Sequence, residues 1–286
     1  MASIIDLPDF MFMDKKKKYS KMSKVYLTFF GLFVGAIHKK TSKSFFCNIL
    51  NLLFPGDGRI FYSENLYGKK IWNNEKFYFP NKRIDRIIID HKRHFQFLFD
   101  TYCLDSINFE EQDTIIDCGA NVGELAISLQ VNNIFCNYIG FEPDPESFKA
   151  LKKNVSPYNY LIYKLALSNK EEKMKLYLNT DGADSSLIYF GTDNSINVET
   201  KMLDSFNYDK IKLLKIEAEG AELEVLKGSI KTIKKTEYIT VDYGPERGVD
   251  SVPTTAEIIN FLYENNFRIL KVSKHRQVGL FKNFAI

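Results

Sequence analysis

The sequence predicts an α/β fold: a mostly parallel sheet of seven strands with helices on both faces. Two observations lead to this prediction. From residue 114 onward, short apolar runs alternate with segments of helical periodicity, as in parallel strands joined by helices. The chain then continues with two strand-like runs separated by a short polar stretch, which predicts a C-terminal antiparallel hairpin at the sheet edge. Residues 1–110 lack this alternation and are expected to form an N-terminal extension of helical and hairpin segments.

Composition is that of an ordinary globular protein. The 286 residues suit one large domain with an extension, and 45% of them are hydrophobic and 26% charged. A net charge of +3 is too small to predict a polyanionic partner, so we expect no nucleic acid to bind. The four cysteines show no CxxC or zinc-ligand spacing, which favours reduced thiols in a cytoplasmic protein.

The extension begins with a basic run and an apolar run. Residues 14–24 read DKKKKYSKMSK, and residues 25–37 read VYLTFFGLFVGAI. The apolar run is shorter than the roughly 20 residues that cross a bilayer, and no signal-peptide cleavage pattern follows it. Two interpretations remain open. One is a buried helix with solvated lysines around it, and the other is peripheral contact of residues 15–54 with the inner face of an anionic membrane.

The rest of the extension predicts short hairpin strands and a helix that leads into the domain. Residues 59–80 alternate aromatic and polar side chains, and apolar residues recur at helical spacing from 85 to 104. His91 and His94 lie three residues apart on this helix, as metal ligands often do. No third ligand is near them in the sequence, so we predict no metal site.

The domain expected at 111–286 contains five parallel strands and the hairpin. The predicted parallel strands are 114–118, 136–142, 160–167, 211–218 and 237–243, and the hairpin strands are 267–272 and 277–284. Helices are expected at about 123–131, 145–154, 221–230 and 254–265. These elements together predict a Rossmann-like seven-stranded sheet.

The first strand of this domain ends in a glycine turn that suits a ligand. The run TIIDCGANVGELAISL passes from a strand through Asp117 and Gly119 to a helix that opens near Gly123. Such a turn leaves backbone N–H groups free at a helix N-terminus. Asn121 and Glu124 replace glycines of the dinucleotide fingerprint, and no Lys-Ser/Thr follows as in a P-loop. Both of those phosphate-binding motifs are therefore excluded.

Acidic residues after the first two strands indicate the ligand. Glu142 lies 19 residues beyond Gly123, where a carboxylate accepts hydrogen bonds from ribose hydroxyls. Asp117 would complement an ammonium group. Together they predict S-adenosyl-L-methionine (SAM), which carries both an amino acid and a ribose. The alternative is a Rossmann-like sheet whose acids only cap helices.

The chain resembles the FkbM-type SAM-dependent methyltransferase family in five ordered motifs: IIDCGANVG, GFEPDPESFKALKKN, LALSN, SSL and LLKIEAEGAELEVLKGS. The resemblance covers roughly residues 112–245. It implies O-methylation of a hydroxyl, often on a sugar or glycan. It also implies cofactor-binding roles, the last two at the adenine, for Asp117, Gly119, Ala120, Asn121, Gly123, Glu142, Pro143, Ala166 and Leu167.

Two positions depart from the family pattern. The usual Asp-x-Glu-Gly is Glu217-Ala218-Glu219-Gly220 here, and Ala126 replaces a residue that usually carries a hydroxyl. The extra methylene of Glu217 moves a carboxylate by about an ångström, which matters for alignment of reacting groups. The alanine removes one hydrogen bond to the cofactor.

Acids after the fourth and fifth strands are the candidate catalytic residues. The sulfonium of SAM already activates the methyl group, so the protein must align the acceptor oxygen and help remove its proton. Ligands of open α/β sheets lie beyond the carboxyl ends of the strands, where Glu217, Glu219 and Asp242 fall. We expect Glu219, then Glu217, to be the base, with Lys215 orienting one of them. The alternative for each acid is a helix cap.

The sequence therefore predicts a SAM-dependent O-methyltransferase for a sugar or glycan hydroxyl. The turn-rich loop at 179–188 is expected to cover the acceptor, with hydroxyls from Ser185 and Ser186. Two alternatives stay open. One is a lipid, nitrogen or carboxylate acceptor, and the other is a non-catalytic SAM-binding or membrane scaffold protein.

Overall fold

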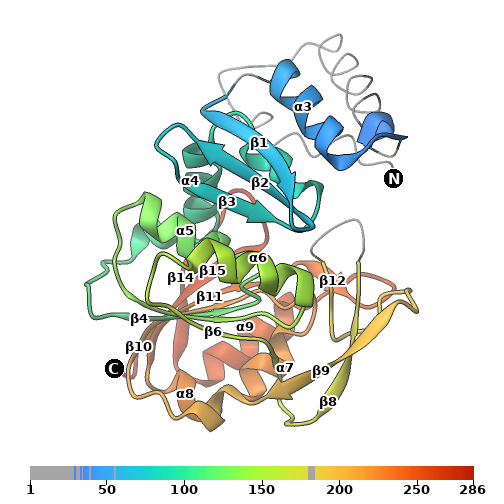
Figure 1. Cartoon of the computed structure of the whole chain (residues 1–286). Helices are drawn as coiled ribbons and strands as arrows, with labels where there is room; N and C mark the ends of the chain where they lie inside the picture. Colours follow the sequence, from blue (N-terminus) through green and yellow to red (C-terminus); the bar gives the residue numbers. More distant parts are fainter. Residues whose placement is uncertain (1–28, 30–32, 34, 39, 55, 180–183) are drawn as a thin grey trace. The chain divides into compact units, whose positions relative to one another are not determined.

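The computed structural model describes residues 29, 33, 35–38, 40–54, 56–179 and 184–286. The chain divides into two compact units, Met1–Phe97 and Leu98–Ile286 (Figure 1). The division lies within helix α4 (His91–Thr101), before the predicted domain start at residue 111. Each unit is described by itself.

The N-terminal unit is built on a three-stranded antiparallel sheet. The strands are β1 (Gly58–Ser63), β2 (Leu66–Ile71) and β3 (Lys76–Phe79), which confirms the predicted hairpin strands. Helix α3 (Lys43–Leu53) begins at Ser42, whose hydroxyl accepts the Phe45 N–H, and contacts β1. The predicted helix over 85–104 is shorter in the structure, because the 3-10 turn η1 (Lys82–Ile87) precedes α4.

Much of the predicted membrane-contact segment lies outside the described residues. This applies to the basic run 14–24 and to most of the apolar run 25–37, of which residues 29, 33 and 35–37 are described and helical. Among the described residues, no helix is both long enough and apolar enough to cross a membrane.

The C-terminal unit contains the predicted seven-stranded sheet, in the order β14-β15-β11-β10-β4-β5-β6. Its parallel strands are β4 (Thr114–Cys118), β5 (Asn137–Phe141), β6 (Leu161–Tyr163), β10 (Ile211–Ile216) and β11 (Thr236–Asp242). The hairpin strands β14 (Phe267–Val272) and β15 (Val278–Asn283) pair antiparallel, and β15 pairs antiparallel with β11. The carboxyl ends of the five parallel strands therefore meet at one edge.

Helices cover this sheet on both faces. They are α5 (Glu124–Val131), α6 (Pro145–Val155), α7 (Glu222–Lys227), α8 (Ile230–Ile233) and α9 (Thr255–Glu264). Figure 1 shows α5 and α6 on one side of the sheet and α7 and α8 on the other. The predicted helix at 221–230 is divided at Gly228, where a Cβ atom would lie 2.0 Å from the Ser168 carbonyl oxygen.

A second small sheet was missed by the sequence prediction. The expected single strand at 160–167 divides into β6 and β7 (Ala166–Leu167), and β7 leaves the main sheet to pair with β9 (Ser195–Lys201). β9 also pairs with β8 (Lys173–Tyr177). The short β12 (Pro245–Arg247) and β13 (Val252–Pro253) form a further pair.

Candidate active site

The turn between β4 and α5 requires its glycines. Gly119 has a φ of 75°, and a Cβ atom there would lie 1.9 Å from the Glu217 carbonyl oxygen. Gly123 has a φ of 87°, and its Cβ atom would meet Leu151 of α6 at 2.9 Å. Only glycine adopts such a backbone without strain. The turn thus packs closely against both β10 and α6.

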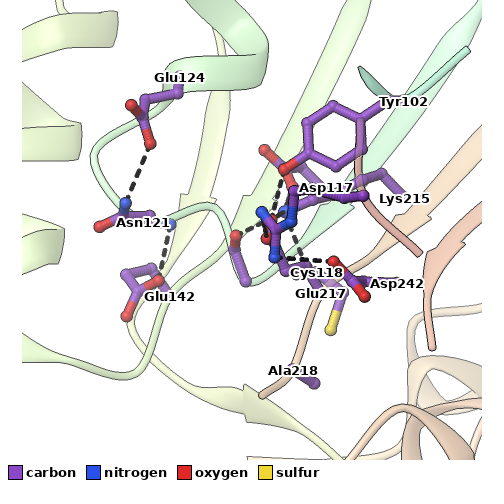
Figure 2. Close-up of polar contacts among 12 residues, drawn as sticks. Tyr102, Asp117, Cys118, Asn121, Glu124, Glu142, Lys215, Glu217, Ala218 and Asp242 are labelled. Atoms are coloured by element: carbon purple, nitrogen blue, oxygen red, sulfur yellow. Dashed lines mark hydrogen bonds and ion pairs between the residues drawn. The ribbon is translucent and has the colours of Figure 1, made fainter. Parts of the chain in front are cut away.

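The Glu142 carboxylate holds this turn from the end of β5. One of its oxygens accepts the Asn121 backbone N–H at 2.7 Å (Figure 2). The other accepts the Asp144 N–H at 2.8 Å. Burial raises the pKa of Glu142 to about 8, although these hydrogen bonds oppose the shift. Each oxygen keeps a lone pair, so the carboxylate can still accept bonds from ribose hydroxyls.

Asn121 offers a buried acceptor in the same turn. Its side-chain amide donates to Glu124 at 3.1 Å, as Figure 2 shows. Its side-chain oxygen is buried and has no hydrogen-bond partner among the described residues. A buried acceptor without a partner is costly, so a ligand with donor groups fits here. Together with the close turn and Glu142, this oxygen makes the residues compatible with the hydroxyl and amino groups of SAM.

Asp117 is held by side chains of the two neighbouring strands. Its buried carboxylate accepts the Tyr138 hydroxyl at 2.6 Å and lies 3.0 Å from the Lys215 ammonium. Both oxygens therefore face side chains of neighbouring strands. The predicted contact of Asp117 with the cofactor ammonium stays a prediction.

Lys215 links β10 to the turn between β4 and α5. Its side chain is 3% exposed, its ammonium donates to the Gly119 carbonyl at 2.8 Å, and it lies 3.2 Å from Glu217 (Figure 2). Burial lowers the pKa of Lys215, but the carboxylate of Asp117, followed by other nearby groups, outweighs burial and raises it well above its usual value. Lys215 is thus a buried, charged group between two carboxylates.

Glu217 is held on both of its oxygens. One oxygen accepts the Tyr102 hydroxyl and faces Lys215, and the other lies 2.7 Å from the Arg276 guanidinium. Burial raises the pKa of Glu217, but Arg276 and Lys215 outweigh burial and hold it well below its usual range. A carboxylate stabilised in this way is a weak base.

Glu219 has the opposite environment. In the described part of the chain, its carboxylate makes no hydrogen bond or ion pair with another residue. Its pKa is raised well above the usual value by burial and by the carboxylates of Glu246, Glu217 and Asp184. The residue has a φ of 50°, a left-handed conformation that is uncommon outside glycine and that clusters at functional sites.

Three side chains hold the backbone of this left-handed turn. The Ser186 hydroxyl donates to the Glu219 carbonyl at 2.7 Å, and Arg247 donates to the Gly220 carbonyl at 2.6 Å. Glu222 accepts the Ala218 and Gly220 N–H groups at 2.8 and 3.1 Å. Glu222 therefore holds the turn that precedes α7, and the N-cap residue of that helix, Ala221, has no side-chain cap. Ser186 uses its hydroxyl on the turn.

The other predicted site residues lie at the ends of strands. Asp242 accepts the Gly244 N–H at 2.9 Å and lies 2.7 Å from Arg276. The Ala120 N–H, in the turn between β4 and α5, donates to the Phe141 carbonyl at 2.9 Å. Pro143 lies just after β5, and Ala166 and Leu167 form β7, which follows β6. All three are predicted cofactor-binding residues.

Two site residues escaped the sequence prediction. Tyr102 precedes Glu217 by 115 residues, and Arg276 follows it by 59. Neither lies in a motif or at a spacing that relates it to the strand ends. Lys215 was among the predicted residues because it precedes Glu217 and Glu219 at alternate positions of the strand, and the structure pairs it in register with Asp117 across β10 and β4.

Potential metal ligands gather elsewhere in the described residues, in the N-terminal unit. Asp57, Asp90 and His91 offer ligand atoms within 4.8 Å of one another. The buried Lys69 donates to Asp57, which also pairs with His91, so an ammonium group already compensates the Asp57 carboxylate of this cluster. His94, the second histidine of the HxxH pair, is outside the group.

Comparison with known proteins identifies similar sequences. Residues 117–269 match the family model of the methyltransferase FkbM domain. The chain is 26% identical over 152 residues to the hexuronic acid methyltransferase AglP of Haloferax volcanii, covering 51% of this chain and 61% of that protein. It is 25% identical over 158 residues to the 2-O-methyltransferase NoeI of Sinorhizobium fredii, covering 46% of this chain and 63% of that protein.

A third curated relative and a solved structure also match this chain. Methyltransferase sdnD of Sordaria araneosa is 27% identical over 170 residues, which are 46% of this chain and 66% of that protein. The chain thus spans just under two thirds of the length of these curated relatives. The crystal structure of methyltransferase FkbM from Methylobacillus flagellatus matches with a TM-score of 0.45 at 15% identity, over 67% of this chain and 50% of that one.

Proposed function

This chain belongs to the FkbM methyltransferase family, and we propose that it transfers the methyl group of SAM to a hydroxyl of a sugar or glycan-type acceptor. The observation that carries the proposal is the geometry of Glu219. Among the described residues its carboxylate forms no ion pair, and it lies on a left-handed turn just beyond the carboxyl end of β10, whereas its neighbours Glu217 and Asp242 pair with Arg276. When bound, SAM would supply a methyl group that its sulfonium has already activated.

The cofactor would lie over the β4–α5 turn. Gly119 allows close backbone approach, the Asn121 side-chain oxygen accepts a donor group, and Glu142 accepts the ribose hydroxyls. Asp117 at the amino-acid end, and Ala166 with Leu167 at the adenine, complete the proposed set. Lys215 fixes this turn relative to the acids of β10 through its bond to the Gly119 carbonyl.

Glu219 would then accept the proton of the acceptor hydroxyl. A sugar hydroxyl is a poor nucleophile, and a base within hydrogen-bond reach helps as the new bond forms. Because its pKa is raised, the Glu219 carboxylate is a stronger base than that of Glu217. A cationic ligand nearby would favour the ionised form of Glu219. Glu217, held by Arg276 and Lys215, would orient the site.

The acceptor class is supported by the relatives. One is named a hexuronic acid methyltransferase and another a 2-O-methyltransferase. A sugar hydroxyl is consistent with a site that supplies a carboxylate base.

The proposal is tested by incubating the purified protein with SAM and a panel of free sugars, glycolipids, lipids and amines. We expect S-adenosylhomocysteine to form and a sugar-containing acceptor to gain the mass of one methylene group. Glu219→Gln should lower turnover by about 10²–10⁴-fold, and Glu217→Gln, as the matched variant, by less. Methylation of a lipid or an amine would refute the acceptor class. SAM binding without turnover on any acceptor would favour a non-catalytic SAM-binding protein.

We also propose that residues 15–54 contact an anionic membrane from the cytoplasmic side. Residues 15–56 contain nine lysines and no acidic residue, a charge of +9, whereas the rest of the chain has 30 basic and 36 acidic residues, a charge of −6. In the described part of this segment, Phe45 and Leu52 lie seven residues apart on α3 and are 54% and 82% exposed. Exposed apolar residues beside lysines suit anionic lipid.

Flotation with vesicles tests this contact. The full-length protein should float with phosphatidylserine-containing vesicles at low salt and detach as salt rises, and it should not float with neutral vesicles. A Phe45→Ser/Leu52→Ser variant should float less, while Phe135→Ser, which changes an exposed phenylalanine outside the segment, should not. Equal flotation of both variants, or no flotation of the wild type, would refute the contact.

A further inference from the structure

Arg276 forms ion pairs with acids at the carboxyl ends of two neighbouring strands, β10 and β11, although it lies in a distant part of the sequence. It lies in the link between β14 and β15, and its side chain is 37% exposed. One guanidinium nitrogen lies 2.7 Å from Glu217, which follows β10. The other lies 2.7 Å from Asp242, the last residue of β11, and 3.3 Å from Glu246. One side chain thus forms ion pairs with acids at the ends of both strands.

This pairing divides the acids of the site into two groups. Glu217 and Asp242 have close cationic partners, whereas Glu219 has none among the described residues. The charged groups that shift the pKa of Glu219 come from several elements. Glu246 belongs to β12 and Glu217 follows β10. Asp184 lies in the loop between β8 and β9, and Arg276 lies in the link between β14 and β15. Arg276 is the cation among these groups.

We propose that Arg276 is a positioning residue that selects the base: by pairing with Glu217 and Asp242, it leaves Glu219 as the carboxylate that receives the acceptor's proton. This inference rests on the proposed methyl transfer. It adds a residue that lies outside the motifs matched to the family by sequence. Arg276 itself would not touch the reacting atoms.

Removal of the guanidinium has a defined consequence for Glu219. In Arg276→Met, Glu219 loses the nearby guanidinium, Asp242 and Glu246 lose their ion pair with it, and Glu217 keeps only Lys215 as a cationic partner, so the negative charge around Glu219 is less compensated. Negative neighbours favour the protonated form of Glu219. The acidic limb of the pH profile of kcat/KM should therefore move to higher pH. Arg276→Lys keeps the charge but loses the two-pronged geometry, so its limb should stay near that of the wild type.

The test compares pH profiles of kcat/KM for the wild type, Arg276→Lys and Arg276→Met, with SAM affinity measured by calorimetry. We expect the limb of Arg276→Met to rise by about one pH unit, which is about a tenfold loss of rate at a pH below both limbs, with SAM affinity within about twofold. A merely structural role would lower the thermal midpoint without moving the limb. An unmoved or lowered limb in a folded Arg276→Met protein overturns the inference.

Two further measurements keep the inference testable. If Arg276→Met does not fold, Glu217→Gln removes one negative neighbour of Glu219 and should move the limb to lower pH, and an unmoved limb there overturns the inference. If the wild type transfers no methyl group, the proposed function fails. The titration of Glu219, followed by carbon-detected NMR in wild type and Arg276→Lys or Arg276→Met, then decides the electrostatic part. An unchanged Glu219 titration in Arg276→Met overturns that part.

Discussion

Replacing Lys215 by methionine would remove the ammonium group that lies between two buried carboxylates. Lys215 is 3.0 Å from Asp117 and 3.2 Å from Glu217, and its side chain is 3% exposed. Glu217 would keep Arg276 and Tyr102 as partners, so the stranded charge is that of Asp117. Breaking a buried ion pair by removal of one partner costs about 3–5 kcal/mol. For a unit of this size that corresponds to a loss of about 6–20 °C in the thermal midpoint.

The destabilisation should depend on pH in a predictable direction. Burial raises the pKa of Asp117 even with Lys215 present, and loss of the ammonium would raise it further. A carboxyl whose pKa is higher in the folded than in the unfolded state destabilises the fold above the unfolded value, and this effect is relieved as the pH falls through the folded value. The loss in the free energy of unfolding caused by Lys215→Met should therefore be large at pH 8 and smaller at pH 5.

The assay is urea unfolding followed by circular dichroism at both pH values. A Lys215→Met/Asp117→Asn double variant serves as the control, because the neutral amide keeps the shape without the charge and should recover much of the loss. An equal deficit at pH 8 and pH 5, or a double variant no more stable than Lys215→Met, would refute the assignment of Asp117 as the stranded charge.

Three further predictions concern the cofactor turn and the base. Glu142→Gln should weaken SAM binding by about 10- to 100-fold in calorimetry. Because the pKa of Glu142 is about 8, wild-type affinity should increase between pH 7 and pH 9 and that of the variant should not; parallel profiles would contradict the ribose contact. Gly119→Ala should abolish SAM binding, since its Cβ atom would lie 1.9 Å from a carbonyl oxygen, whereas Gly191→Ala, also at positive φ but in open space, should cost only about 1 kcal/mol of stability. Ser186→Ala should lower kcat by about tenfold with unchanged SAM affinity, because it frees the Glu219 carbonyl, and Ser185→Ala should not; equal effects would argue against a role in positioning.

The main sheet was predictable because its strands are buried on both faces and appear as continuous apolar runs. β10, for example, reads IKLLKI and is almost entirely buried. β8, which reads KMKLY, is half exposed and carries lysines, so nothing distinguished it from a loop. The expected strand at 160–167 was divided because β7 pairs with β9, a contact between segments far apart in the sequence.

Residues of the candidate site could be located from the sequence where an acidic side chain lies at or just after the end of a strand. Asp117, Glu142 and Glu219 lie at or just beyond the ends of β4, β5 and β10, and their positions follow from strand boundaries. Their partners could not be predicted in the same way. Tyr102 and Arg276 reach Glu217 from segments on either side of it in the sequence, and only the folded sheet brings them together.

The position of β15 in the sheet has a consequence for biosynthesis. β15 lies between β11 and β14, so β14 leaves the ribosome first but can join the sheet only after β15 has been made and inserted. Arg276 lies in the link between them. While the chain is being synthesised, Glu217 and Asp242 therefore lack their shared guanidinium partner until Arg276 has been made and β15 has joined the sheet. Ribosome stalling before residue 276 should therefore yield a nascent chain that is more sensitive to protease than one stalled with β15 outside the exit tunnel.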